Sequence, residues 1–570
     1  MNGRCENKVV WLPRAWFAKF NNNGSYSTGQ IQSDLANVAN SNRYIDGKSS
    51  VLTIPLCLAV TSTADMGGVL TAENNFAASL KNGYHQLINS ISLSLTNNEV
   101  ISIQSFQNLL INYKILTSFT ETDVSNYGTT LGFTKDTSVS PQYQSGYVVA
   151  AGANGNSYST IGMGVCNNVI GTKTAGTGCN TTNIDLQYGY CLKQNTGRLQ
   201  RMLSTSCNET DNNSFVKASS FSGMLKNNVN QNAARVITYH ILATIPMSFL
   251  HDFFLKCPLM KNAYYKLVIN TNTNITINQT VTNTGTITAT TINSPFGVNP
   301  VMLSPLALTG HSTGDGFIVS AAANTITTTL QIVGANQANV TCHPMNQCRI
   351  YGSLIEMTPQ YETMYLQNKV KKIIYNDILT YNNILNVTGT QTFNVTTGAW
   401  DNTTGGQVNT TLTPGLSRLR RLTIFPFISA SANGRLASGV MNSPYASEPG
   451  TCSPYCAITD FNVMLSGQVI YNQNKRYAFE NYLEECRPAH SINGGLCCGL
   501  SSGLLSQMDH DSSYGFITVD LSRHNKEADN ISKSVQVVFT NASKFACDFI
   551  CIIEYEKEIN VDVELGAIIL

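Results

Sequence analysis

Two stretches of the chain match the Gly-x-Ser-x-Gly pattern of serine hydrolases. Residues 310–314 centre on Ser312, and residues 499–503 centre on Ser501. In those enzymes the serine occupies a sharp turn between a strand and a helix, which exposes its hydroxyl to a base. Neither stretch has that context, because glycine and proline surround them, and a chain with 42 glycines produces such matches by chance. We interpret Ser312 and Ser501 as loop serines and expect no enzymatic activity.

Thiols and imidazoles offer a second kind of chemistry, metal binding. Cys342, His343 and Cys348 form one group, and Cys452 with Cys456 forms another. Structural zinc is held by paired ligands at short spacing, such as two cysteines separated by two to four residues. Only the second group has that spacing, and it lacks a further pair. We therefore expect no metal or cofactor and interpret these cysteines as thiols.

Histidine beside a carboxylate could provide acid–base chemistry, and two places have this neighbourhood. They are His251-Asp252 and Asp509-His510-Asp511, and His524 is a third candidate. The second is more typical of a solvated turn than of a titrating pair. The chain also lacks a Gly-Lys-Ser/Thr phosphate loop and a His-Glu-x-x-His metal motif. We expect no catalytic residues.

Length and composition indicate a large structural protein. A single core stops growing at roughly 250–300 residues, so 570 residues predict two large domains. Only 12% of residues are charged and the net charge is +1, so the chain as a whole has no positive electrostatic potential that would attract nucleic acid. No apolar run approaches the roughly 18–20 residues of a membrane span, and charges interrupt residues 1–20. We expect no signal peptide and expect the 16 cysteines to stay reduced.

Strand patterns cover most of the sequence. Ile91, Leu93 and Leu95 alternate with serines, and residues 559–565 alternate in the same way, the period of a half-buried strand. Further strands are expected at residues 264–270, 326–333, 422–427, 462–471, 516–522, 535–540 and 549–555. Helical spacing is confined to residues 106–113, 248–256 and 358–369, the last with Thr358 as N-cap and Pro359 at the first helical position. Without βαβ alternation or repeats, an antiparallel all-β fold is favoured.

Three stretches differ from this framework in composition. Residues 120–230, 271–340 and 386–414 are rich in Gly, Asn, Thr and Ser, and we interpret them as long loop insertions at one end of a sandwich. Outer loops can grow into solvent, so we place these insertions at the distal end of the molecule.

Both ends of the chain carry weaker signals. Residues 1–20 mix basic and aromatic side chains, including Arg4, Lys8 and Trp11. Such an arm could reach beneath a neighbouring subunit or touch anionic material, or it could pack on its own subunit. The apolar residues 568–570 require some covering surface.

Several blocks of sequence carry a family resemblance. Residues 245–260, IPMSFLHDFFLKCPLM, followed by residues 264–270, resemble the first-domain signature of the major capsid proteins of virophages and polinton-like viruses. Residues 349–359 look like the strand that closes that domain. The second-domain pattern is resembled by residues 458–467, 477–480, 516–523 and 554–562. These blocks follow the family's order across about residues 50–565, which is more specific than any single block. The three insertions have no counterpart in it.

The resemblance implies a particular fold, two tandem eight-stranded antiparallel jelly rolls. It divides the chain into an arm and lead-in (1–50), a first jelly roll with insertions near 120–230 and 271–340 (51–358), a linker helix (359–370), a second jelly roll with an insertion near 386–414 (371–556) and a tail (557–570).

The function that the resemblance implies is that of a non-enzymatic major capsid protein. Homotrimers would form pseudo-hexameric capsomers that tile an icosahedral shell around double-stranded DNA. Its partners would be neighbouring capsomers, penton and other minor capsid proteins, with assembly in the host cytoplasm or nucleus and residence in the virion. The alternative is a trimeric attachment fibre or a glycan-binding β-sandwich protein, which would share the composition.

Overall fold

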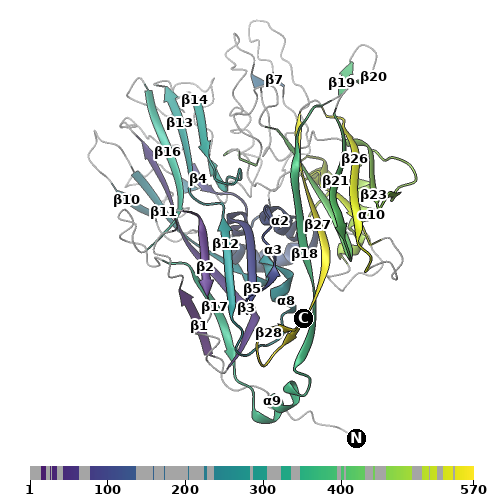
Figure 1. Ribbon diagram of the computed structural model, residues 1–570. Coiled ribbons are helices and arrows are strands. Elements are labelled where there is room, and N and C mark those ends of the chain that lie inside the picture. The colour runs from purple at the N-terminus through teal and green to yellow at the C-terminus, as the bar shows by residue number, and fades with distance from the viewer. Residues whose placement is uncertain are drawn as a thin grey trace.

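The computed structural model describes most of the framework of the chain. The described residues are 15–20, 26, 28–34, 43–62, 77–135, 158–159, 172–173, 203–204, 224–227, 236–282, 287–303, 323–334, 347–389, 391–394, 399–402, 406–429, 441–442, 444, 458–490, 503–512, 514–522, 530–543 and 546–569. Strands predominate among them, so the prediction of an all-β protein is confirmed. They form two units that stand side by side with their long strands running in similar directions (Figure 1).

The C-terminal unit is a sandwich of two antiparallel sheets. One sheet has the order β18-β27-β22-β25, and the other has the order β21-β26-β23-β24. In chain order the strands are β18 (Val370–Val387), β21 (Gln407–Leu416), β22 (Leu419–Ile428), β23 (Ile458–Leu465), β24 (Gln468–Val469), β25 (Ile517–Asp520), β26 (Lys533–Asn541) and β27 (Cys547–Asp562). Thus the first, eighth, third and sixth strands share one sheet, and the second, seventh, fourth and fifth share the other. This is the order of a jelly roll, a double Greek key.

The N-terminal unit repeats this order. Its framework strands are β1 (Ala15–Phe20), β2 (Gln30–Asp34), β3 (Tyr44–Ser62), β5 (Ile88–Leu95), β6 (Asn98–Ile101), β11 (Val236–Pro246), β12 (Tyr265–Thr271) and β17 (Arg349–Ile355). One sheet contains β1-β17-β3-β11 and the other is β2-β12-β5-β6. The chain is a double jelly roll.

Alternating apolar side chains build the core of each unit. On β3, Leu52, Ile54, Leu56 and Leu58 are fully buried, and they point to one face because side chains of a strand alternate in direction. Burying each such side chain stabilises the fold by about 1.5–3 kcal/mol. One continuous apolar cluster extends through both units, so the two sandwiches share a core.

The segment 271–340 is not the loop that its composition predicts. It contains β13 (Ile275–Thr282), β14 (Ile287–Asn293), β15 (Val301–Leu303) and β16 (Ala323–Ile332). β16 pairs with β3 and β13, so the segment extends the first sheet, and Ile277 and Leu330 are fully buried. Composition favoured a loop, but threonine, abundant here, also favours strands when it alternates with isoleucine, and the strand expected at residues 326–333 of this segment corresponds to β16.

The other two insertions are only partly loops. Segment 386–414 holds a hairpin, β19 (Gln391–Asn394) with β20 (Ala399–Asn402), but its last residues begin framework strand β21. Segment 120–230 begins with helix α3 (Glu121–Leu131), capped by Thr120 and Asp123. Its other described strands are β7 (Tyr158–Ser159), β8 (Thr172–Lys173), β9 (Leu203–Ser204) and β10 (Met224–Asn227). In Figure 1, β7, β13, β14, β16, β19 and β20 lie at the upper end.

The ends of the two jelly rolls also differ from the predicted boundaries. β1 and β2 are framework strands, so the first jelly roll begins within the expected lead-in 1–50 rather than at residue 51. The expected tail 557–570 contains the end of β27, which pairs with β18 as far as Asp562, and then β28 (Ala567–Ile569), which pairs back on β27. Helix α9 (Pro359–Leu366) links the units at their lower end, with Thr358 as N-cap and Pro359 at its first turn as predicted (Figure 1).

The interface between the two jelly rolls as candidate functional site

Helix α2 (Gln107–Ser118) of the first jelly roll inserts an aromatic side chain into the second. Tyr113 is fully buried, and its ring meets the rings of Phe425 and Phe516 edge to face, with centroids 6.3 and 5.3 Å away. Its hydroxyl lies 3.0 Å from Thr518 Oγ1 and 3.2 Å from Cys486 Sγ. All four partners belong to the second jelly roll or to its helix α10 (Phe479–His490). Tyr113 therefore anchors one unit in the other.

A buried ionic group stands beside this anchor. Glu554 of β27 pairs with Arg421 of β22 and with Lys114 of α2, whose Nζ lies 2.8 Å from Glu554 Oε1. The Arg421 guanidinium also lies over the Tyr113 ring, 5.0 Å from its centroid. Burial by itself raises the pKa of Glu554, but the positive charges of Arg421 and Lys114 outweigh it and lower the pKa to about 2. The carboxylate is thus held ionised between the two units.

A second buried carboxylate, Asp377 of β18, faces the first jelly roll. His251 separates two short helices, α7 (Met247–Leu250) and α8 (Asp252–Lys256), where the sequence predicted one. His251 Nδ1 accepts a hydrogen bond from the Phe253 N–H, which directs Nε2 toward Asp377 Oδ1 at 3.5 Å. Lys557 Nζ lies 3.5 Å from Asp377 Oδ2. Burial favours a raised pKa for Asp377, but His251, Lys557 and the Ile378 N–H lower it on balance.

Hydrogen bonds to the main chain complete the connection. Tyr375 and Lys557 both donate to the carbonyl of Val100, at 2.7 and 2.8 Å. Lower down, the Lys261 N–H donates to Val563 at 2.8 Å and Thr96 Oγ1 donates to Gly566 at 2.9 Å. One of these bonds joins two main chains and the other three join a side chain to a main chain, so the two jelly rolls are connected at several points along their interface.

The chemistry available at this interface is structural. The side chains of His251 and Asp377 are 2% and 0% exposed, so no substrate reaches them. Among the described residues, no three His, Cys, Asp or Glu side chains are grouped so that they could hold a metal ion. No described helix is both long and apolar enough to cross a bilayer.

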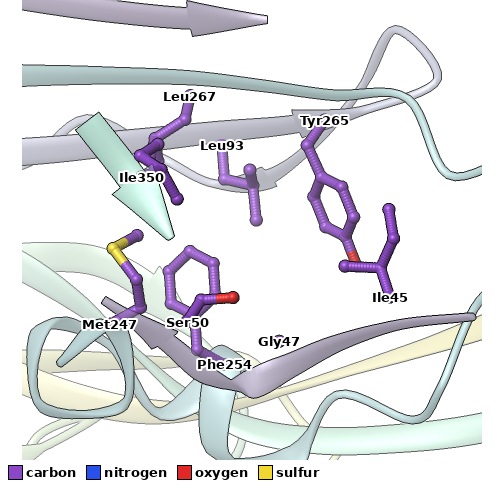
Figure 2. Close-up of a pocket in the computed structure, with 9 residues that line it drawn as sticks. All are labelled: Ile45, Gly47, Ser50, Leu93, Met247, Phe254, Tyr265, Leu267 and Ile350. Atoms are coloured by element: carbon purple, nitrogen blue, oxygen red, sulfur yellow. The ribbon is translucent and has the colours of Figure 1, made fainter. Parts of the chain in front are cut away.

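A small cavity lies inside the first jelly roll. It has a volume of about 30 Å³ and is lined mostly by apolar side chains such as Leu93, Met247 and Phe254 (Figure 2). A space of that size admits little more than one or two waters, and its apolar walls offer water few partners. It is a packing defect of the core rather than a binding pocket for a substrate.

Another buried polar group, here named the amide cluster, lies between α2 and the first jelly roll. It consists of His85, Gln86, Asn89, Asn108, Asn112 and Asn272. Asn108 donates to Gln86 Oε1 at 3.1 Å, Asn272 donates to the Gln86 carbonyl at 2.9 Å, and His85 Nε2 lies 3.3 Å from Asn112 Oδ1. Six further polar atoms of the cluster have no hydrogen-bond partner among the residues that the structure describes. An unpaired buried polar atom costs about 1–3 kcal/mol.

The structure places only some of the residues that the sequence singled out. Ser312, Ser501, Cys342, His343, Cys452 and Cys456 lie outside the described residues. Cys348 is buried, and burial raises the pKa of its thiol to about 12, as for an inert core cysteine.

The interpretation of residues 509–511 as a solvated turn was wrong. They belong to helix α11 (Gln507–Ser512), where Asp509 and His510 are buried. Asp509 accepts hydrogen bonds from Ser506 and lies 3.3 Å from Lys135, so it is a capping and pairing residue. This short helix has no regular apolar spacing from which its burial could be inferred.

For the N-terminal arm, the described part packs on its own subunit. β1 pairs with β17 along its whole length, Ala15 opposite Leu354 through Phe20 opposite Arg349. Residues 1–14 lie outside the described residues. Of the two alternatives for the arm, self-packing holds for residues 15–20.

Sequence reasoning missed the charged residues of the interface. Lys114, Asp377, Arg421 and Glu554 each stand inside a helix or strand pattern and look like ordinary surface charges. A signal was present, because Glu554 follows an uninterrupted run of apolar residues, 549–553. A charged residue at the end of a strand that is buried on both faces requires a partner of opposite charge.

Comparison with known proteins gives similar solved structures but no similar curated sequence. No family model and no curated sequence matches the chain. Among solved structures, the chain is similar to a chain of the Sputnik virophage determined by cryo-electron microscopy, with 11% identity, a TM-score of 0.48 and coverage of 98% of this chain and 88% of that one. The mavirus major capsid protein has 9% identity and a TM-score of 0.43, with coverage of 100% of this chain and 93% of that one. The Faustovirus major capsid protein has 8% identity and a TM-score of 0.41, with coverage of 98% of this chain and 92% of that one. At such identities and scores, the strand order and the interface described above remain the basis for function.

Proposed function

We propose that this chain is a major capsid protein, whose homotrimers form pseudo-hexameric capsomers of an icosahedral shell around double-stranded DNA. The observation that carries the proposal is that two jelly rolls stand side by side with aligned strands and share one apolar core (Figure 1). Three such chains about a threefold axis bring six sandwiches together, and six similar bodies in a ring have a nearly hexagonal outline. A hexagonal tile fills a lattice without gaps. Sequence resemblance to virophage and polinton-like virus capsid proteins supports the same function.

The same interface supports the proposal of a non-enzymatic role. Its carboxylates, Asp377 and Glu554, are buried and paired, and they serve to fix one sandwich against the other. Penton and other minor capsid proteins and neighbouring capsomers are the partners that such a tile requires, and the virion is where it resides.

The test of this proposal is the assembly state of the purified protein. Light scattering after gel filtration should give about three times the chain mass of 61.9 kDa, and electron microscopy should show particles with a hexagonal outline. Rods would favour the alternative of an attachment fibre. A monomer that persists at micromolar concentration would contradict the proposed trimer.

We also propose that the upper end in Figure 1, where β13, β14, β16, β19 and β20 lie, faces outward in the particle. The support is steric, since insertions at the outer end extend into solvent, whereas at the inner end they would meet the genome. Surface labelling of intact particles followed by mass spectrometry should modify segments 271–340 and 386–414. Labels confined to α9 and the C-terminal hairpin would reverse the orientation.

A further inference from the structure

The amide cluster contains a balanced set of unpaired groups. Three are amide nitrogens that can donate, two are amide oxygens that can accept, and the last is an imidazole nitrogen. They are Gln86 Nε2, Asn89 Nδ2, Asn112 Nδ2, Asn108 Oδ1, Asn272 Oδ1 and His85 Nδ1. All six side chains are at least 97% buried. Bulk solvent therefore does not satisfy them.

The tautomer of His85 completes the set. Asn112 Oδ1 can only accept, so His85 Nε2 carries the proton of their contact and Nδ1 is a bare acceptor. Burial lowers the pKa of His85 to about 4, which keeps the ring neutral at neutral pH. The cluster then presents three donors and three acceptors.

Exchanging oxygen and nitrogen within the amides does not remove the deficit. The side-chain amides of Asn108 and Gln86 meet through a single hydrogen bond. If oxygen and nitrogen are exchanged in both amides, that bond is kept with its direction reversed, and each amide still has one atom without a partner. For Asn272, the present orientation already donates to the Gln86 carbonyl, and exchange would bring two oxygens together. The summed cost of six unpaired atoms would rival the stability of a whole domain, so the cluster cannot be dry.

We propose that the amide cluster is a binding site for ordered water. An anion would need donors alone and a cation would need acceptors alone, whereas water donates and accepts and fits a mixed set. A buried water makes about three hydrogen bonds, so about two waters would satisfy six atoms. The cluster spans four elements, namely η1 (Tyr84–Leu87), the start of β5 at a register shift, α2 and the β12–β13 connection.

The consequence of bound water concerns α2. Asn108 and Asn112 are one turn apart on the helix face toward the first jelly roll, and Tyr113 extends from a different face into the second. The waters would hold the polar face of α2 in place and so fix the position of the aromatic anchor.

The experiment is a crystal or cryo-electron microscopy map of the full chain at a resolution that shows ordered water. We expect water density peaks, and each peak should lie within hydrogen-bond distance of at least two of the six atoms. An empty cluster, or side chains that turn to pair all six atoms with one another, would overturn the proposal.

Two variants sharpen this result. In Asn112→Ser, a shorter side chain leaves room, and an additional water peak should replace the amide group. In the control Ile111→Val, on the same helix but outside the cluster, the water peaks should be unchanged. A void without density in Asn112→Ser would show the site to be dry and contradict the proposal.

Discussion

Replacing Glu554 by glutamine tests whether the ionic group between the jelly rolls stabilises the protein. The substitution Glu554→Gln keeps the shape of the side chain but removes its charge, so Arg421 and Lys114 lose their anionic partner. Glu554 has a side chain only 3% exposed and Arg421 one only 15% exposed. Removing one partner of a buried pair costs about 3–5 kcal/mol, since the remaining charge stays buried without compensation. We expect a loss of stability of that size at neutral pH.

The lowered pKa of Glu554 leads to a similar magnitude. Its pKa is lowered from 4.5 to about 2 in the folded protein. That difference corresponds to about 3 kcal/mol at about 1.4 kcal/mol per pKa unit. A lowered pKa means that the contribution is complete above pH 4.5 and disappears as the pH falls toward 2. The difference between wild type and Glu554→Gln should therefore shrink over this range.

A matched control lies on the same strand. Glu556 pairs with Arg420 at 2.6 Å, but these side chains are 30% and 28% exposed. Exposed pairs contribute about 0–1 kcal/mol, so Glu556→Gln should change stability little. The assay is denaturant unfolding of both variants and wild type at several pH values. Equal losses in the two variants, or a loss in Glu554→Gln that does not vary below pH 4.5, would refute the reasoning.

Three further predictions concern packing and metals. Gly566→Ala should lower the free energy of unfolding by more than about 2 kcal/mol, because φ of Gly566 is +60° and a Cβ there would lie 2.4 Å from Ala263 Cα of the other jelly roll. The control Gly467→Ala, where φ is +82° but the surrounding space is open, should cost only about 1–2 kcal/mol. Similar melting temperatures for the two variants would contradict this prediction. Gly47→Ala should raise the free energy of unfolding by about 0.5–1 kcal/mol, because the added Cβ would lie beside the small cavity at ordinary contact distances, 3.6 Å from Cys257 Cβ and 3.7 Å from Cys257 Sγ. A lower denaturation midpoint would contradict this prediction. Chelator treatment should leave the melting temperature unchanged, and a drop together with zinc in elemental analysis would restore a metal site.

Strands and their alternation were predictable from the sequence because each has one buried face. The predicted strands at residues 264–270, 326–333 and 535–540 correspond to β12, β16 and β26. The domain limits were less predictable, because β1 and β2 are short and β28 pairs only with the end of β27. Their place in the sheets depends on partners more than 200 residues away or on a hairpin, which no local pattern reveals.

The interface was unpredictable for a different physical reason. A lysine in a helix and a glutamate in a strand are ordinary surface residues until the partner that neutralises them is known. Lys114 and Glu554 are 440 positions apart in the chain and meet only when both jelly rolls are folded. Local periodicity reports burial of apolar groups, whereas a buried charge depends on a specific long-range pairing.

The directional contacts of this interface have a consequence for the proposed capsomer. A chain whose two sandwiches could hinge would give a trimer with an irregular outline, and such tiles would not close a regular shell. Apolar packing by itself tolerates sliding, because it has no preferred direction. Directional contacts do not: the Tyr113 hydroxyl, the Glu554 ion pairs and the bonds to the Val100 carbonyl are each satisfied in one arrangement only. Burying charge in this interface therefore serves to fix an angle, and in a trimer that angle determines how nearly the six sandwiches approach a hexagon.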